Sequence, residues 1–379
     1  MLDAIHLTLL IGPIVPIPAP RVVIDALKSV TVTTAAGSPS GFQLDFEFPT
    51  DSALNTLLLI AAGTNASPAT PPLRIMLIVT LNGVLTPLFD GVMNTFDIQA
   101  GQNGSAGTIT VTGSDLTAVM DMIDFSGLPY PAMPIEGRFA VICAKYAAFG
   151  LIPLPVPVLF PDVPIPVDRI PTHQGTDLQY VRKLADDVGY VFYLEPGPVP
   201  GTNIAYFGPE IKVGIPQPAL NIDMDAHTNI ESMSFSFEPT KGVQPIVFIQ
   251  NQLTRVPIPI PIPNLNPLQP PLGVLSTPLA NITMLNDTAK LNPMQAISRG
   301  LAEAKKSQDS VTANGELNVL HYGRMLKARG LVGVRGAGFA YDGLYFVESV
   351  TSTLSRDSFK QRFTLTRNGL ISITPKVPA

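Results

Sequence analysis

Apolar and polar residues alternate along much of the chain, but only over short segments. Six such segments read SVTVTTAAGSPSGFQLDFEF, RIMLIVTLNG, GTITVTGSD, SMSFSF, YFVESVTSTL and KQRFTLTRNG, and Gly, Pro or Asn bounds them. Alternation with a period of two is typical of strands that bury one side. The pattern predicts a mainly β protein.

A helical period is clearest within residues 173–194, HQGTDLQYVRKLADDVGYVFYL. Thr176 and Gln179 have the spacing of a capping box, which predicts a helix that begins at Asp177. Gly189 stands where a left-handed residue usually ends a helix, and residues 190–194 then read as a strand. The apolar residues that recur at the helical period, and that we expect to face a core, are Leu178, Val181, Leu184, Ala185 and Val188.

Two further stretches are predicted to be helical. One covers residues 136–148, and the other covers residues 293–308, where Asn292 fits an N-cap and Pro293 fits the first helical position. Residues 51–62 fit either a helix or a strand. The helical signals before residue 225 indicate an α+β region in the middle of the chain.

Proline alternates with Ile, Val or Leu in three tracts, residues 13–20, 153–166 and 257–271. Alternate prolines remove the N–H donors of a strand ladder, so these tracts are predicted to be loops or sheet edges. Apolar loops of this kind pack either on a partner or on their own domain, and the sequence leaves both alternatives open.

A short sequence repeat occurs once in the N-terminal third of the chain and once near the C-terminus. Residues 79–91, VTLNGVLTPLFDG, and residues 331–343, LVGVRGAGFAYDG, both end in Asp-Gly and are followed by two strand-like segments. The Asp-Gly pairs that contain Gly91 and Gly343 suit tight hairpin turns. We interpret the repeat as one β unit used twice, with chance similarity between hairpins as the alternative.

Composition excludes several classes of protein. The 379 residues carry a net charge of −5 and only 14% charged residues, which provides no basic surface for nucleic acid. The single cysteine, Cys143, lies in an apolar helical pattern and is expected to be a small buried side chain. The apolar start lacks the cationic region of a signal peptide, and residues 256–285 contain too many prolines for a membrane-spanning helix.

The sequence provides little that suggests catalysis. His6, His173, His227 and His321 fall in four separate segments without the spacing of a metal site, and we interpret His173 as a loop histidine. No nucleotide-binding glycine motif is present, so no cofactor is expected. Asp186, Asp187 and Glu231 fit a glycosidase only by residue type, and the chain has no Trp to stack on a sugar.

The motif at 173–194 resembles the helix-strand signature of the baseplate hub family of contractile tails, the phage late control protein D type, which is also the hub half of VgrG-type spike proteins. The C-terminal segment from GELNVLHYGRML to FTLTRNG is similar to the last barrel of that family, including Tyr-Asp-Gly before a strand and the closing Arg-Asn-Gly. The segments LFDGVMNTFDIQ and TITVTGSD are similar to its first barrel. The Pro-rich tracts depart from the family pattern.

The resemblance implies two tail-tube-like β-barrel domains, residues 1–125 and 226–379, which flank a small helix-strand domain, residues 126–225. The second barrel would carry a Pro-rich insertion at 256–272 and the helix at 293–308. The resemblance also implies a structural, non-enzymatic homotrimer that adapts a six-fold inner tube or tube-initiator protein to a three-fold spike, in contact with other baseplate components. It would assemble in the cytoplasm and end in a phage tail baseplate or an injection particle, with the spike supplied by a separate protein.

In that setting the residues singled out above have structural or interface roles, and none is catalytic. These residues are Thr176, Gln179, Leu178, Val181, Leu184, Val188, Gly91 and Gly343. Two other functions compete with the hub. One is a tail-associated peptidoglycan hydrolase, and the other is a β-rich membrane-inserting protein, which the mean hydropathy of +0.29 favours but the irregular strand succession does not.

Overall fold

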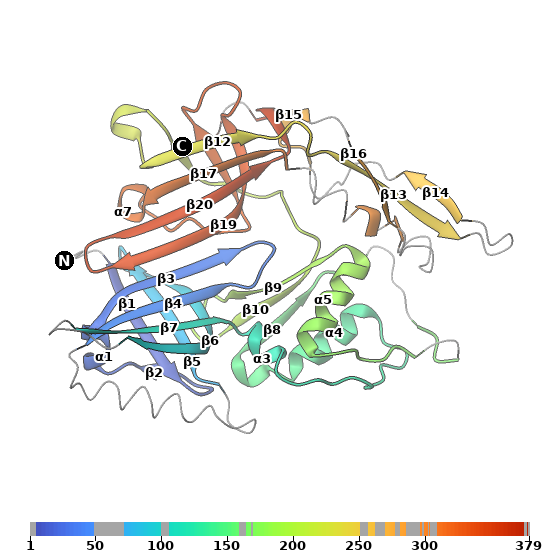
Figure 1. Ribbon diagram of the computed structural model, residues 1–379, viewed down its shortest axis with the longest axis horizontal. Coiled ribbons are helices and arrows are strands. Elements are labelled where there is room, and N and C mark those ends of the chain that lie inside the picture. The colour runs from blue at the N-terminus through green and yellow to red at the C-terminus, as the bar shows by residue number, and fades with distance from the viewer. Residues whose placement is uncertain are drawn as a thin grey trace.

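The computed structural model describes residues 5–48, 72–99, 106–158, 164–167, 170–250, 257–261, 270–276, 281–285, 296–297, 299–301, 303, 309–374 and 377. Figure 1 shows a stack of long strands, a helical region beside its lower half, and a strand arm that extends from its upper half. The fold is mainly β with an α+β middle domain, as the sequence predicts.

The first barrel forms from the N-terminal strands. A tight hairpin joins β5 to β6 through Asn82 and Gly83, whose φ angles of 51° and 80° suit a two-residue turn. A bulge in β6 at Asn94 shifts its register against β7. The elements are β1 (Ile5–Gly12), β2 (Ile17–Pro18), α1 (Arg21–Ala26), β3 (Leu27–Ala35), β4 (Gly41–Phe48), β5 (Arg74–Leu81), β6 (Val84–Gln99) and β7 (Gly107–Asp115).

The second barrel forms mainly from the C-terminal strands. A bulge in β19 at Glu348 shifts its register against β20, as the bulge in β6 does in the first barrel. The elements are β11 (Gln217–Asn221), η2 (Asp225–His227), β12 (Ser232–Phe237), β17 (Val311–Asn318), α7 (Val319–Tyr322), β18 (Leu331–Arg335), β19 (Gly343–Ser355) and β20 (Phe359–Arg367). The sequence assigns β11 to the middle domain, but β11 pairs with β18 and so extends this barrel.

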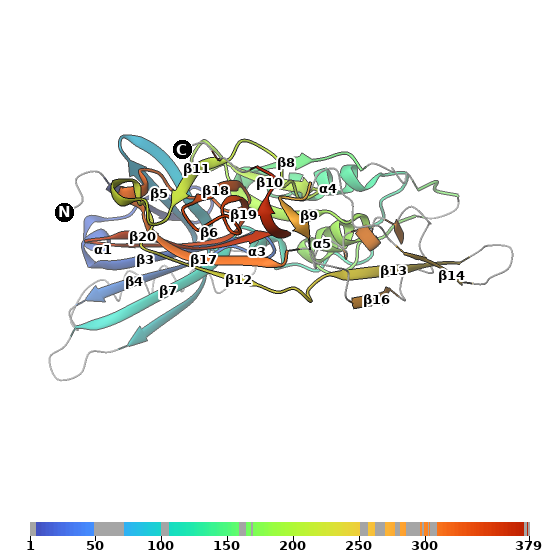
Figure 2. The same cartoon turned by 90° about the horizontal axis from the view of Figure 1, so that it is seen from above.

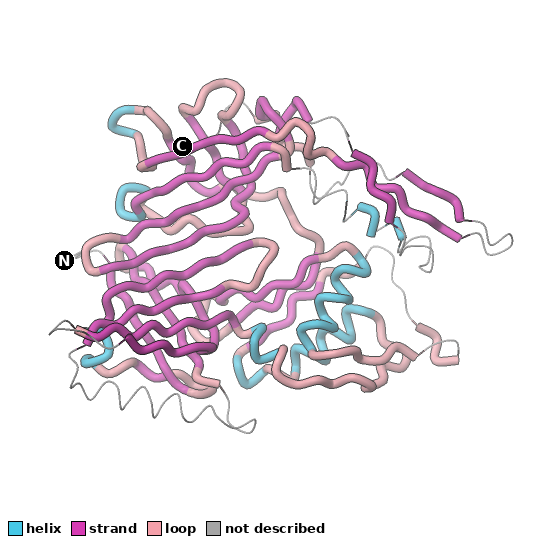
Figure 3. The backbone as a smooth tube through the Cα atoms, in the orientation of Figure 1, coloured by secondary structure: helices cyan, strands magenta, loops and turns pink. Residues whose placement is uncertain are grey.

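The two barrels have the same strand order. Neighbouring strands run β5-β6-β7-β4-β3 in the first barrel and β18-β19-β20-β17-β12 in the second. In both series, the first three strands follow one another along the chain, and the last two precede them in reverse order. Antiparallel pairing of β3 with β19 joins the two series into one 13-stranded sheet, whose long strands lie in succession in Figures 1 and 3. One apolar core extends through both barrels.

The middle domain has a core of its own, built by helices on a three-stranded sheet. β8 runs parallel to β10, and β9 runs antiparallel to β10. The predicted helix at 177–188 is confirmed, and the one at 136–148 becomes an α-helix followed by a 3-10 turn. The elements are α3 (Thr117–Met120), α4 (Ile135–Ala144), η1 (Ala147–Phe149), β8 (Leu151–Pro155), α5 (Asp177–Val188), β9 (Val191–Pro196) and β10 (Asn203–Gly208).

The arm consists of β13 (Val243–Gln250), β14 (Pro257–Pro261) and β16 (Asn281–Leu285), and it projects away from the barrels in Figures 1 and 2. Beside it, β15 (Gly273–Ser276) pairs with β21 (Gly369–Ser372). The strands that the structure describes in the Pro-rich tracts are β2, β8 and β14, and each lies at the edge of a sheet, where a missing proline N–H leaves no second neighbour unpaired. Other described residues of the tracts, such as 13–16 and 156–158, lie in turns or loops.

Two sequence predictions fall largely outside the described residues. Residues 51–62 lie outside them entirely. Of the helix predicted at 293–308, the described positions 296, 297, 299–301 and 303 are helical. Among the helices that the structure describes, none is both long and apolar enough to cross a lipid bilayer.

Candidate functional site

The junction between the barrels is an antiparallel pairing of seven residue pairs, from Ser349 opposite Ala35 to Ser355 opposite Ser29. Alternation gives the junction two different sides. Val32 and Leu354 are buried in the common core. On the opposite side, the hydroxyl oxygens of Thr33 and Thr351 lie 3.2 Å apart. The two barrels therefore form one folded unit.

Arg329 reinforces the junction from the second barrel. Its Nη2 donates to the carbonyl oxygen of Ala35 at 2.7 Å, at the end of β3. The guanidinium also lies over the ring of Tyr193 in β9, 4.0 Å from the centroid. This one side chain therefore contacts the first barrel and the middle domain as well as its own barrel.

The side of the long sheet that faces away from the core is polar. Asp45 accepts hydrogen bonds from Ser29 Oγ at 2.8 Å and Thr110 Oγ1 at 3.0 Å, and Thr364 Oγ1 donates to Asn314 Oδ1 at 2.9 Å. The hydroxyl and amide residues of this polar face include Ser29, Thr31, Thr33, Gln43, Thr95, Thr110, Thr112, Ser234, Ser236, Asn314, Ser349, Thr351, Thr353 and Thr364.

Several of the charges on the polar face neutralise one another. Glu316 accepts from Lys360 Nζ at 3.0 Å and from Arg362 Nε at 2.8 Å. Hydrogen bonds from these two cations lower the pKa of the Glu316 carboxyl. Lys28 lies 3.9 Å from Glu47 at the other end of the face. The result is a wide polar surface with weak net charge.

A buried ion pair fastens the first barrel to the middle domain. Arg74 Nε and Nη2 donate to the two carboxylate oxygens of Asp90 at 2.7 and 2.6 Å, and both side chains are almost fully buried. Asn203 Nδ2, in β10, donates to the same carboxylate at 2.7 Å. Arg74 also reaches the carbonyl oxygen of Gly201 at 3.1 Å. Asp90 thus has a positioning role that the repeat motif did not reveal.

The hairpin prediction is wrong for Gly91. Gly91 lies inside β6, opposite Ile75 and Asp115, and the actual turn is at Asn82 and Gly83. A Cβ at Gly91 would collide with the carbonyl oxygen of Ser114 and the ring of Phe89, so close packing explains the glycine.

Gly343 opens β19 with a φ of 123°, a conformation that favours glycine. Gly91 and Gly343 lie in equivalent strands but not at equivalent positions. Gly91 precedes its bulge residue Asn94 by three residues, whereas Gly343 precedes Glu348 by five. The sequence alignment of the repeat is therefore displaced by two residues, which preserves the face to which each side chain points.

The two C-terminal motifs that carried the family resemblance lie together. The buried Arg367 donates from Nε to Gly369 O at 2.7 Å, from Nη1 to Asp342 O at 3.0 Å and from Nη2 to Ala340 O at 2.7 Å. Its guanidinium also covers the ring of Tyr345. Arg367 therefore holds the turn before β19 against the end of β20.

Helix α5 begins and ends as the sequence predicts. Thr176 Oγ1 accepts from the N–H of Gln179 at 3.3 Å, and the N–H of Thr176 donates to Gln179 Oε1 at 3.4 Å, which completes a capping box. Gly189 ends the helix with a φ of 71°. The predicted apolar face is buried in the core of the middle domain, at Leu178, Val181, Leu184, Ala185 and Val188.

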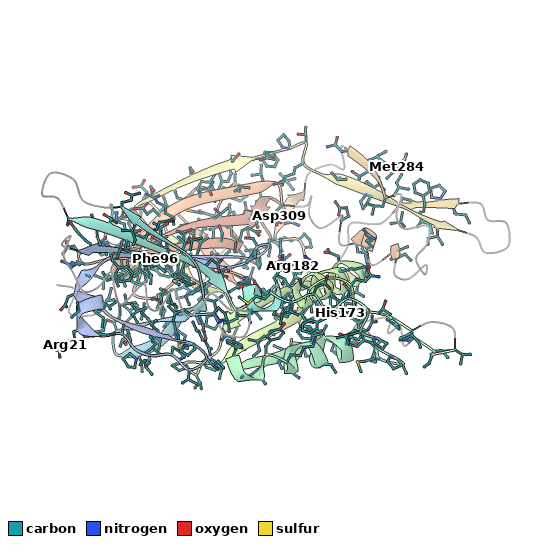
Figure 4. All side chains as sticks on the ribbon, turned by 60° about the horizontal axis from the view of Figure 1, so that its bottom comes forward. Arg21, Phe96, His173, Arg182, Met284 and Asp309 are labelled. Atoms are coloured by element: carbon teal, nitrogen blue, oxygen red, sulfur yellow. The ribbon has the colours of Figure 1, made fainter. Side chains whose placement is uncertain are left out.

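His173 is buried, although the sequence suggested an ordinary loop histidine. Its Nδ1 lies 2.9 Å from the hydroxyl of Tyr130, and its Nε2 lies 3.4 Å from Asp177 Oδ1. Asp177 also accepts from Lys145 Nζ at 2.9 Å and Tyr146 OH at 2.7 Å. Figure 4 labels His173 among the side chains of this domain. These contacts join the loop before α4, the residues directly after α4, the loop before α5 and the first residue of α5.

The ionisation of this cluster fits a packing role. Burial lowers the pKa of His173, despite the nearby carboxylate of Asp177. Burial also raises the pKa of Tyr130 to about 12. Cys143 is buried as predicted, and burial followed by the charge of Asp177 raises the pKa of its thiol to about 12. A neutral thiol of this kind is a poor nucleophile.

The carboxylates considered for a glycosidase have different surroundings. Asp186 is exposed near the end of α5, and burial raises the pKa of the neighbouring Asp187. Glu231 precedes β12 in the second barrel and forms a 2.6 Å ion pair with Lys360. A cleft of about 780 Å³ between the barrels and the middle domain is lined by Asp186, but neither Asp187 nor Glu231 is among its lining residues.

No protein-family model matches the sequence, and no curated protein matches it. Solved structures do match. A tail protein from Neisseria meningitidis MC58 aligns over 97% of this chain and 98% of its own, with a TM-score of 0.62 and 13% identity. The 43 kDa tail protein of prophage MuSo2 from Shewanella oneidensis aligns over 96% and 99%, with a TM-score of 0.62 and 12% identity.

A third similar structure is a component of the type VI secretion system from E. coli, which has structural similarity to the T4 bacteriophage tail proteins gp27 and gp5. It aligns over 93% of this chain and 78% of its own, with a TM-score of 0.51 and 10% identity. At these identities the similarity is one of fold. The chain therefore has the β-rich fold of these tail proteins.

Proposed function

We propose that the chain is the structural hub of a contractile tail or contractile injection baseplate, a trimeric adaptor between a six-fold inner tube and a three-fold spike. The observation that carries the proposal is the repeated strand order. Two barrels with the same order lie edge to edge in one chain, joined through β3 and β19.

Two similar barrels in one chain would resolve a mismatch of symmetry between the tube and the spike. Closed rings of three-fold and six-fold symmetry have no matching set of interfaces. Three copies of a chain with two similar barrels present six similar units to a tube, while the chain as a whole keeps three-fold symmetry towards a spike. The middle domain occurs once per chain, which suits a three-fold contact.

The polar face supports the same proposal. In a ring of barrels, the side of the sheet opposite the core would line the central channel. Its hydroxyl, amide and mutually paired charged groups provide a wet surface with weak net charge. With such a lining, the channel of the tube would continue through the hub, and its wall would not bind transported molecules strongly.

The solved structures with this fold support the setting, since they include two tail proteins and a component of a type VI secretion system. The hub would assemble in the cytoplasm and then reside in a virion tail or an injection particle. Its partners would be a tube or tube-initiator protein, a spike protein and other baseplate components. The cluster around His173 is buried and makes its hydrogen bonds within the middle domain, which supports a packing role for these side chains.

Native mass spectrometry of the purified full chain tests the proposal. The expected species has three times the subunit mass of 40.4 kDa. Electron microscopy of the assembled particle is then expected to show three copies between the tube and the spike. A chain that stays monomeric at all concentrations, or that enters the particle as six copies, would contradict the adaptor.

A further inference from the structure

The strand edges of the long sheet that have no partner within the described residues include those of β12 and of the second half of β6. β12 pairs with β17 on one side only. The pairing of β6 with β5 ends at Val92, so the stretch from Thr95 to Gln99 pairs only with β7. Unpaired edges expose backbone N–H and C=O groups that can accept another strand.

The junction inside the chain shows which edges belong together, because the barrels are related strand by strand. In the first barrel, direct cross-strand pairing leads from Thr31 in β3 to Gln43 in β4, to Thr112 in β7 and to Thr95 in β6. Thr95 is the first paired residue after the bulge in β6.

The same path runs through the second barrel. It leads from Ser234 in β12 to Asn314 in β17, to Thr364 in β20 and to Ser349 in β19, again the first paired residue after the bulge. Ser234 is therefore the counterpart of Thr31, and Thr95 is the counterpart of Ser349. β12 corresponds to β3, and the second half of β6 corresponds to the part of β19 that pairs with β3.

We propose that β12 of one copy pairs antiparallel with the second half of β6 in a neighbouring copy, repeating between chains the junction that β3 and β19 form within one chain. This inference rests on the proposed trimer and specifies its interface. Carried over from the internal junction, the register sets Ser234 opposite Gln99, Phe235 opposite Ile98, Ser236 opposite Asp97, and Phe237 opposite Phe96.

The side chains agree with this register. Ser236 and Asp97 would both lie on the polar face, as Thr33 and Thr351 do in the internal junction. On the core side, Phe235 would cover Ile98, and aromatic residues opposite aliphatic or aromatic residues stabilise strand pairs. The proposed contacts also avoid opposed like charges.

Exposure supports the same edges. Ile98 is 43% exposed in the single chain, whereas its counterpart in the internal junction, Ser352, is 4% exposed. Phe96, labelled in Figure 4, is half-buried, whereas its counterpart Val350 is 3% exposed. The residues that the internal junction covers are thus open at the matching position of the first barrel.

The contact is head-to-tail, because the two edges differ. A head-to-tail contact gives a closed ring when its rotation closes. Three copies would then contain three internal and three intermolecular junctions in alternation. In every copy, β12 and the second half of β6 would both be paired.

Disulfide trapping in the purified full-length chain tests the register. Directly opposite antiparallel residues have Cα atoms about 4.5–5.5 Å apart, within the range of a disulfide. A chain that carries both Ser236→Cys and Asp97→Cys is expected to form a covalent trimer on mild oxidation, visible on a non-reducing gel. The native Cys143 is fully buried and serves as an internal background.

Matched controls make the result specific. Either single variant is expected to stay monomeric on the gel, and a mixture of the two singles is expected to stop at a dimer. The pair Ser232→Cys and Asp97→Cys is displaced by four residues, about 13 Å along the strand, and is expected to remain uncrosslinked.

The outcomes separate this inference from the proposed function. A native trimer that forms no covalent product, or that crosslinks equally well through the displaced pair, overturns the strand junction but leaves the adaptor standing. A chain that is monomeric in solution and uncrosslinked overturns both. A covalent trimer through the in-register pair alone supports both.

Discussion

Thr33 and Thr351 place their hydroxyl oxygens 3.2 Å apart across the junction of β3 with β19, although 318 positions separate them in the sequence. Behind this polar contact, Val32 and Leu354 belong to a core that extends through both barrels. Because the two barrels share a sheet and a core, neither has a complete buried interior of its own. We therefore expect them to unfold together.

Leu354→Ala tests this expectation. The cavity is expected to lower the free energy of unfolding by about 2–5 kcal/mol. Thr353→Ala, on the exposed polar side of the same strand, is expected to cost less than about 0.5 kcal/mol. Urea denaturation followed by circular dichroism measures both. Two resolved barrel transitions, of which only one moves in Leu354→Ala, would contradict the common core.

The buried pair of Arg74 and Asp90 is expected to be sensitive to the loss of either partner. Asp90→Ala leaves the guanidinium buried without its carboxylate, which typically costs about 3–5 kcal/mol. The matched control is Glu47→Ala in the exposed pair with Lys28, where the expected cost is within about 1 kcal/mol. Equal effects in thermal denaturation would show that Asp90 does not hold the barrel to the middle domain.

His173 is expected to make stability depend on pH. Burial lowers its pKa in the folded chain below the usual 6.5, so the unfolded chain takes up this proton first as the pH falls. The contribution of His173 to the free energy of unfolding is therefore fully present above pH 6.5. It declines as the pH falls below 6.5, until His173 is protonated in the folded chain as well.

Melting temperatures between pH 8 and pH 5 measure the effect. The decline is expected to be steeper in the native chain than in His173→Gln, while His321→Gln, at an exposed position, is expected to keep the native slope. An unchanged slope in His173→Gln would exclude His173 as the titrating group.

Local pattern predicted the parts of this fold that depend on near neighbours. The capping box of Thr176 and Gln179, the end of α5 at Gly189 and the apolar face around Leu184 all follow from residues within one or two turns. The alternation in β3, β12 and β20 predicted strands for the same reason. The Pro-rich tracts were predicted to be loops or sheet edges because proline lacks an N–H donor.

Contacts between distant segments were beyond the reach of these patterns. Nothing near Asp90 in the sequence indicates Asn203, and the Asp-Gly motif suggested a turn where β6 continues as a strand. His173 looked like a loop residue because its burial depends on Tyr130, 43 positions away. A basic residue at the start of an apolar strand, as Arg74 is, was the available signal for a buried ion pair.

Leu184→Asp is expected to prevent soluble folding. Leu184 is 4% exposed in the core of the middle domain, where an unpaired carboxylate costs several kcal/mol. Lys183→Asp, at the neighbouring exposed position of α5, is expected to remain soluble. The soluble fraction after expression compares the two variants. Soluble Leu184→Asp with a native circular dichroism spectrum would show that the α5 face does not need its apolar side chain.

The projecting arm is expected to contribute to assembly more than to the stability of the single chain. Ile282 and Met284 in β16 are 64% and 61% exposed, and Figure 4 labels Met284 on the arm. In the proposed hub, exposed apolar side chains gathered on a small sheet would contact another subunit or a neighbouring baseplate protein. The double change Ile282→Ser and Met284→Ser is therefore expected to reduce incorporation into baseplates while the melting temperature stays within a few degrees. Ile215→Ser, at a 96% exposed position away from the arm, is expected to alter neither quantity.

Deletion of residues 257–271 tests the same region more severely. A large fall in melting temperature with normal incorporation would instead indicate that the arm packs within its own chain.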